Sequence, residues 1–147
     1  MKRTHWIGIL VIAAVAVGFV GYGVAGEGDD HGMKAKEITV EGLLVDTKCY
    51  GMNPVNWKTT HMTPKGEMPN CAQACAKMGI PVGVLKDGKE GGLVYILVTP
   101  SGALADHMAR TVKVTGMHAY EGGIIPEQVW VKNDEGKWEE VKIATMM

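Results

Sequence analysis

Residues 92–120, "GLVYILVTPSGALADHMARTVKVTGMHAY", decide the fold class of this chain. The first part, "GLVYILVTP", is rich in β-branched and aromatic residues and predicts a strand. "SGALADHMAR" places Leu104 and Met108 on one face, which predicts a short helix. "TVKVTGMHAY" alternates Val112 with Val114 and predicts a second strand. A short helix is therefore expected between two strands.

Three further segments extend this pattern in both directions. "EITVEGLLVD" (37–46) and "VGVLKDG" (82–88) read as strands, and "EQVWVKNDEGKWEEVKI" (127–143) reads as a hairpin with its turn at "NDEG". A helix between the third and fourth strands of a five-strand core is the order of the OB-fold. We expect a mainly β protein, a small OB-like Greek-key β-barrel with a Cys-bearing loop–helix insertion and one short additional helix. A β-sandwich is the alternative.

The insertion spans residues 47–80 of a domain that covers 37–147. Residues 49–69 contain three prolines, two glycines and no hydrophobic period, so they predict a long loop. Loops of this length inside compact domains are usually functional or disordered.

A short helix is expected at 71–78, within "NCAQACAKMGIP". Asn70 is a favourable N-cap, and Gln73 stands three residues later, as in a capping box. Gly79 fits the position after the helix C-cap, and Pro81 prevents continuation.

The N-terminus has the pattern of an export segment. Lys2 and Arg3 precede an uncharged apolar run of 20 residues, 6–25, followed by a polar stretch. Residues 1–25 therefore predict a signal peptide or an N-terminal membrane anchor, and 26–36 a polar linker. Either alternative makes the domain exported: periplasmic, or extracytoplasmic and membrane-anchored. Contact with a membrane is expected only through this segment.

The composition and the missing motifs argue against some classes of function. The formal net charge is −1, so there is no basic surplus to suggest nucleic acid as a partner. The sequence has no Ser-His-Asp order, phosphate-binding glycine motif or haem attachment motif, and thus no enzyme signature. Binding to a protein partner that the sequence does not identify remains an alternative.

Four residues form a candidate metal-ligand set: Cys49, His61, Cys71 and Cys75. Cys49 is expected at the end of the first strand and His61 in the loop. Cys71 and Cys75 are four residues apart, so both thiols share one helix face. The start of the helix would favour the thiolate form of Cys71. Three thiols and one imidazole suit a soft or borderline cation, copper or zinc.

Methionines surround this set. Met52, Met62 and Met68 lie in the predicted loop, and their thioethers are possible additional ligands for Cu(I). Met78 is expected in the core. Trp57 either covers the site or anchors the loop by burying its ring.

Two alternatives to a metal site stay open. Exported proteins usually oxidise their cysteines, so a disulfide could staple a structural or partner-binding barrel. Because a bridge within one helix needs distorted geometry, it would join Cys49 to Cys71 or Cys75. The other alternative is a thiol redox protein.

"GLLVDTKCY", His61 and "CAQACAKMGIPVGVL" together resemble a family of small exported bacterial proteins of unknown function. The likeness covers about residues 38–98 and has the form C...H...CAxxCAxxGxPVGxL. It implies that the three cysteines and His61 belong together, and it implies no activity. The CxxxC-plus-His set also looks like the copper site of cytochrome-oxidase assembly chaperones. That likeness is limited to ligand chemistry, because their thioredoxin-like element order is absent.

Overall fold

Eight strands and three short helices make up residues 36–119 and 122–144, the part of the chain that the computed structural model describes. The export segment expected at 1–25 lies outside the described residues, as does nearly all of the 26–36 linker. No helix in the described ranges is long and apolar enough to cross a bilayer.

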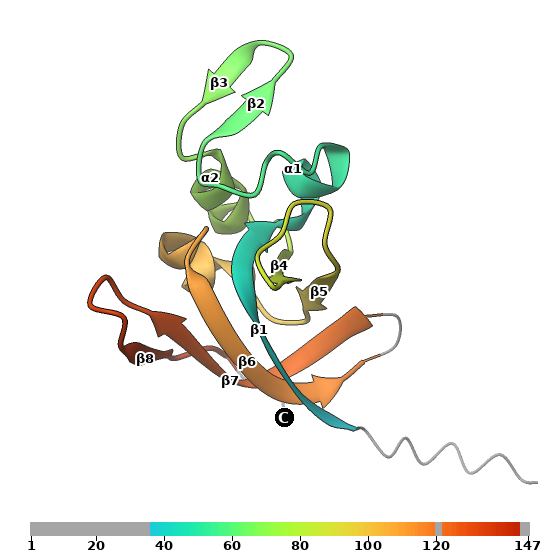
Figure 1. Cartoon of the computed structure of the whole chain (residues 1–147), viewed down its shortest axis with the longest axis vertical. Coiled ribbons are helices and arrows are strands. Elements are labelled where there is room, and N and C mark those ends of the chain that lie inside the picture. Colours follow the sequence, from blue (N-terminus) through green and yellow to red (C-terminus); the bar gives the residue numbers. More distant parts are fainter. Residues whose placement is uncertain (1–35, 120–121, 145–147) are drawn as a thin grey trace, which may run out of the picture. The chain divides into compact units, whose positions relative to one another are not determined.

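Five strands pair around a partly closed ring (Figure 1). They are β1 (Glu37–Asp46), β4 (Val82–Lys86), β5 (Val94–Leu97), β6 (Thr111–His118) and β7 (Gly123–Lys132). β1 runs antiparallel to both β4 and β6, β4 to β5, and β6 to β7. A short parallel pairing of β5 with β7 joins the two ends. The predicted mainly β, barrel-like architecture and its strand order are confirmed.

The hairpin predicted near the C-terminus is also present. β8 (Trp138–Val141) pairs with β7, and the turn between them falls at residues 133–136. The N–H of Gly136 donates to the carbonyl of Asn133 at 3.0 Å, closing the turn.

Alternating side chains of the strands fill the barrel. In β6, Val112, Val114 and Gly116 are buried, while the residues between them are partly exposed. The main core cluster combines such residues from five strands with side chains of two helices. Two glycines allow close backbone approaches. A Cβ on Gly42 would overlap the carbonyl of Leu85, and one on Gly116 would overlap that of Ile125, next to an irregularity in the β6–β7 register.

The helix between the third and fourth barrel strands is the 3-10 helix η1 (Ser101–His107). As its apolar pattern predicts, Leu104 is fully buried and Met108, at the C-cap, is 3% exposed. The hydroxyl of Ser101 donates to the carbonyl of Ala76 at 2.9 Å. This bond fastens the cysteine-bearing helix to the barrel.

The insertion is more structured than its sequence predicts. It contains α1 (Thr47–Met52), a hairpin of β2 (His61–Thr63) and β3 (Gly66–Met68), and α2 (Cys71–Lys77). The expectation of a long irregular loop at 49–69 is wrong. So is the placement of Cys49 at a strand end, because β1 stops at Asp46 and Cys49 lies within α1. The carboxylate of Asp46 caps α1 and turns the chain there.

The two ends of α2 differ in how well they were predicted. Asn70 adopts a left-handed conformation with φ of 56° and makes no side-chain cap bond, so the predicted capping box with Gln73 is wrong. Gly79 has φ of 86°, as expected after a C-cap. The N–H of Ile80 donates to the carbonyl of Cys75 at 3.0 Å, which completes a Schellman-type ending.

Candidate metal centre

All three cysteines meet between α1 and α2. Cys49 comes from α1, and Cys71 and Cys75 come from one face of α2, as their spacing predicts. Each is only 6–7% exposed, and none is bonded to another. With Ile80 they form a small cluster separate from the barrel core. The helix pair thus brings together thiols that are up to 26 residues apart in sequence.

His61 begins β2 and is fully buried. Its Nε2 lies 2.9 Å from the carbonyl oxygen of Lys58. A carbonyl only accepts, so Nε2 carries the proton and Nδ1 presents its lone pair. Metal-bound histidines are usually oriented in this way, with the second nitrogen donating to a carbonyl or carboxylate.

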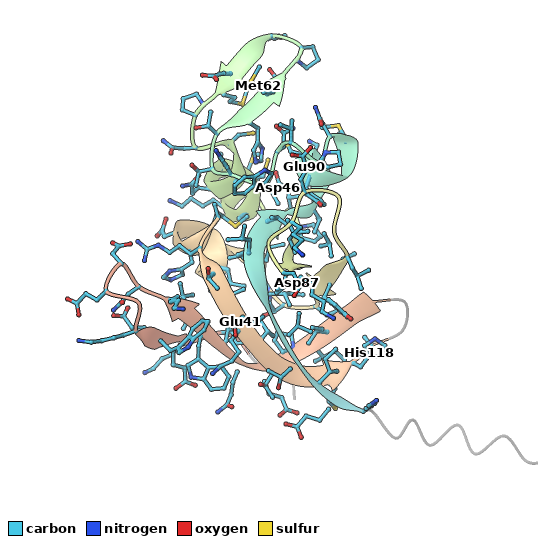
Figure 2. The ribbon with its side chains drawn as sticks, viewed as in Figure 1. Glu41, Asp46, Met62, Asp87, Glu90 and His118 are labelled. Carbon is cyan, nitrogen blue, oxygen red and sulfur yellow. The ribbon has the colours of Figure 1, made fainter. Side chains whose placement is uncertain are left out.

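Asp46 is the residue that the sequence prediction missed. It ends β1 and is 1% exposed. Its Oδ1 accepts a hydrogen bond from the N–H of Lys48 at 2.9 Å, while Oδ2 lies 3.9 Å from Nδ1 of His61. The side chain is labelled in Figure 2, at the end of β1 nearest the insertion. The sequence does contain a signal for this role, because Asp46 stands at the end of a predicted strand and only three residues before Cys49.

The donor atoms form two overlapping triads. Cys49, His61 and Cys71 form one, Asp46, Cys49 and Cys75 the other, and within each triad the ligand atoms lie within 4.8 Å of one another. Sulfurs bound to one zinc at about 2.3 Å in a tetrahedral site are roughly 3.8 Å apart. Small side-chain rotations would therefore bring the donors of each triad to the spacing of ligands that share one ion.

The thiols of Cys49 and Cys75 are held in their protonated form when no metal is bound. Burial, followed by the neighbouring carboxylate of Asp46 and the adjacent thiol of Cys71, raises the pKa of Cys75 from 9.0 to about 11. Burial and the same carboxylate raise the pKa of Cys49 further above its ordinary value. Such thiols are poor nucleophiles near neutral pH.

Two buried polar atoms of the cluster have no hydrogen-bond partner among the described residues: Oδ2 of Asp46 and Nδ1 of His61. Leaving such a group unsatisfied typically costs about 1–3 kcal/mol. A cluster of cysteines serving only as small apolar core residues would not require a carboxylate and an imidazole beside it. A cation among these donors would satisfy both atoms, so the residues present fit a metal ion.

The methionine candidates are all outside the triads. Met52, Met62 and Met68 are 71%, 51% and 46% exposed. Met78 is 72% exposed, so its predicted place in the core is wrong. Trp57 packs against a cluster around Tyr50 and so anchors the insertion rather than covering the thiols.

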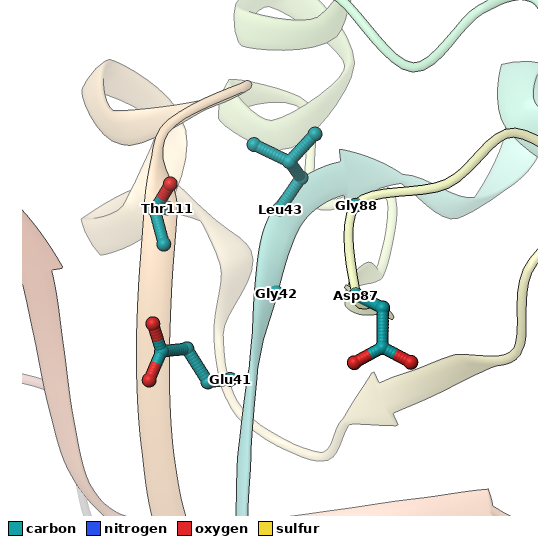
Figure 3. A pocket seen from close by; sticks show the side chains of 6 residues that line it. All are labelled: Glu41, Gly42, Leu43, Asp87, Gly88 and Thr111. Atoms are coloured by element: carbon teal, nitrogen blue, oxygen red, sulfur yellow. The ribbon is translucent and has the colours of Figure 1, made fainter.

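A hollow on the barrel wall offers no comparable chemistry. Figure 3 shows it between β1, the start of β6 and the turn after β4, with the carboxylates of Glu41 and Asp87 on its rim. Both acidic residues are exposed, and no cysteine or histidine lines the hollow. The donor set between α1 and α2 is therefore the strongest candidate site in the described residues.

Comparison of the chain with protein-family models, curated proteins and solved structures finds no match in any of the three.

Proposed function

We propose that this protein is an exported metal-binding module. It holds one copper or zinc ion with the thiolates of Cys49, Cys71 and Cys75 and the Nδ1 atom of His61. The observation that carries the proposal is the pair of buried, unpartnered polar atoms on Asp46 and His61 beside three free thiols. A single cation would satisfy the thiolates, the imidazole and the carboxylate together.

The chemistry of loading follows from the raised thiol pKa values. Each thiol that becomes a ligand releases one proton, so binding is opposed by acid. Asp46 lies against Cys49 and Cys75, and the protons that the thiols release on loading pass to solvent. The carboxylate then serves as a fifth donor or as an outer partner that balances the charge of the ion, while the carbonyl of Lys58 orients His61 through Nε2.

The site belongs to an exported domain, in this proposal, because Lys2, Arg3 and the apolar run at 6–25 have the pattern of an export segment. Outside the cytoplasm such a module handles the ion for a partner or uses it as a structural staple. The resemblance to small exported bacterial proteins, through the same Cys and His positions, supports this reading.

The experiment is a measurement of metal content and free thiols on the full chain, purified without oxygen. We expect about one ion per chain, as for a single Cys3His site. The ion should be absent from Cys71→Ser/Cys75→Ser and from His61→Ala. His118→Ala is the matched control, because His118 is exposed on β6. Full metal stoichiometry in the double cysteine variant would disprove the ligand set.

The competing function is a disulfide-stapled barrel. The Sγ atom of Cys49 lies within 4.8 Å of the Sγ atoms of both Cys71 and Cys75, so a bridge to either needs only a small approach. Metal content and free thiols measured on the same preparation distinguish the metal centre from the disulfide staple. A disulfide staple gives no metal and one free thiol per chain, whereas the metal centre gives three thiols after chelation.

A further inference from the structure

A hollow of about 380 Å³ adjoins the buried centre on the side of the β2–β3 hairpin. Cys49, Met52, Asn56 and Met62 are among the residues that line it. Cys49 also belongs to both donor triads. The hollow and the buried centre therefore share one residue, Cys49.

The walls of this hollow are fixed by Asn56, which is 3% exposed. Its side-chain amide donates to the carbonyls of Cys49 and Met62, each at 3.3 Å, and its oxygen accepts the N–H of Met62 at 2.8 Å. One buried side chain thus ties α1 to β2. Met62 is held opposite α1 for this reason, and Figure 2 shows it on the hairpin.

Two of the residues that line the hollow carry exposed thioethers. Met52 and Met62 are 71% and 51% exposed, whereas Met108 in the barrel core is 3% exposed. An unbranched apolar side chain gains little from packing at such exposure. Thioether sulfur is a soft donor that binds Cu(I) and has little affinity for harder cations.

We propose that Met52, Met62 and Cys49 form an outer binding site for monovalent copper, from which the ion passes to the buried centre. The inference deepens the proposed function and rests on it, since it names copper rather than zinc as the ion received. Cys49 is the residue common to both sites, so the ion exchanges the two thioethers for Cys71, Cys75 and His61 while it remains bound to Cys49.

The transfer conserves charge and oxidation state. Copper stays Cu(I) throughout, and no electron moves. Cys49 releases one proton to solvent when it first binds the ion, and Cys71 and Cys75 release one each as they replace the thioethers. The donor complex loses its copper and keeps its own ligands.

The first test measures the rate at which the full chain removes Cu(I) from its coloured bicinchoninate complex without oxygen. We expect Met52→Leu/Met62→Leu to take up copper about 10-fold more slowly, at the low end of what loss of an outer partner costs a metal site. The final stoichiometry should not change. Met78→Leu is the matched control, because Met78 is as exposed as Met52 and does not line the hollow. Equal rates in all three proteins would overturn the proposal.

The second test reads the thioethers directly in the unmutated chain, so it does not depend on the folding of a variant. The protein carries ¹³C-methyl methionine and is titrated with Ag(I), a soft monovalent ion that does not change oxidation state. The methyl signals of Met52 and Met62 should shift, and that of Met78 should not. Unshifted signals at both positions would refute the outer site.

Zinc separates this inference from the proposed function. Uptake of Zn²⁺ should be the same in the chain with and without the two methionine substitutions. If the cysteine variant shows that the buried centre binds no metal, the proposed function fails. If the buried centre loads normally but neither methionine test gives its expected result, only the outer site fails.

Discussion

At the scale of single residues, the centre depends on Asp46 as much as on the thiols. Its carboxylate has three tasks: it caps α1, it faces Nδ1 of His61 at 3.9 Å, and it raises the pKa of the thiols of Cys49 and Cys75. A buried carboxylate is tolerated only when its charge or its oxygens are matched. The match we infer here is a bound cation.

Asp46→Asn should separate these tasks. Asparagine caps helices as well as aspartate does, so α1 should remain. Without the negative charge, the pKa of Cys75 should fall below about 11 but stay above 9.0, because burial is the larger cause. Thiolate absorbance of the metal-free protein as a function of pH measures this.

The same variant should bind metal about 10- to 100-fold more weakly, as is typical when an outer partner is lost. Glu41→Gln is the control, since Glu41 is an exposed carboxylate on β1. An unchanged thiol pKa together with unchanged affinity would show that Asp46 only caps the helix.

At the scale of secondary-structure elements, the site is assembled by two very short helices and a hairpin. α1 has 6 residues and α2 has 7, too short to be stable alone. Their order comes from contacts: Asn56 joins α1 to β2, and Ser101 holds α2 against η1. The insertion is therefore specified by a few buried polar bonds rather than by helix propensity.

Asn56→Ala should loosen this assembly. Three hydrogen bonds would be lost at a buried position, at about 1 kcal/mol each, so we expect destabilisation of about 2–4 kcal/mol. Amide hydrogen exchange should accelerate in residues 47–63 and stay slow in the barrel strands. Asn53→Ala is the matched control, because Asn53 is exposed and makes one short-range bond. Equal effects of the two substitutions would contradict this account of the insertion.

At the scale of the whole molecule, the candidate metal centre and the barrel core are separate clusters that share α2. Ala72 and Ala76 of this helix pack into the core, while Cys71 and Cys75 face the thiol cluster. The barrel supplies a rigid base, and the centre lies above it within the insertion. Loss of the ion should therefore affect the insertion before the barrel.

The stability of the metal-free protein should fall in alkaline solution. The folded state raises the pKa of Cys75 from 9.0 to about 11, so it binds the thiol proton more tightly than the unfolded state does. The stabilisation is complete below about pH 9 and is lost as the pH rises toward about 11. Denaturant unfolding across this window measures it.

Two comparisons make this pH test specific. Cys75→Ser should show a smaller decline, because the titrating thiol is gone. The metal-loaded protein should also decline less, since its thiols are already ionised and bound to the cation. Identical pH dependence in all three would show that the thiol cluster does not couple to folding.

The sequence by itself determined the barrel strands, the position of the intervening helix and the C-terminal end of α2. These features depend on local periodicity and on residues such as Gly79 and Pro81, whose backbone preferences act within a few positions. The spacing of Cys71 and Cys75 likewise fixed their common face. In contrast, the hairpin at β2–β3 and helix α1 have no strong local pattern, so their prediction as a loop was wrong.

Only the tertiary structure decided that Asp46 joins the thiols, that His61 is buried with Nδ1 turned inward, and that Met52 and Met62 flank a hollow containing Cys49. The physical reason is that each of these depends on contacts between segments far apart in the chain. Burial of a polar side chain cannot be read from its neighbours in sequence, because the groups that desolvate it and bond to it come from other elements.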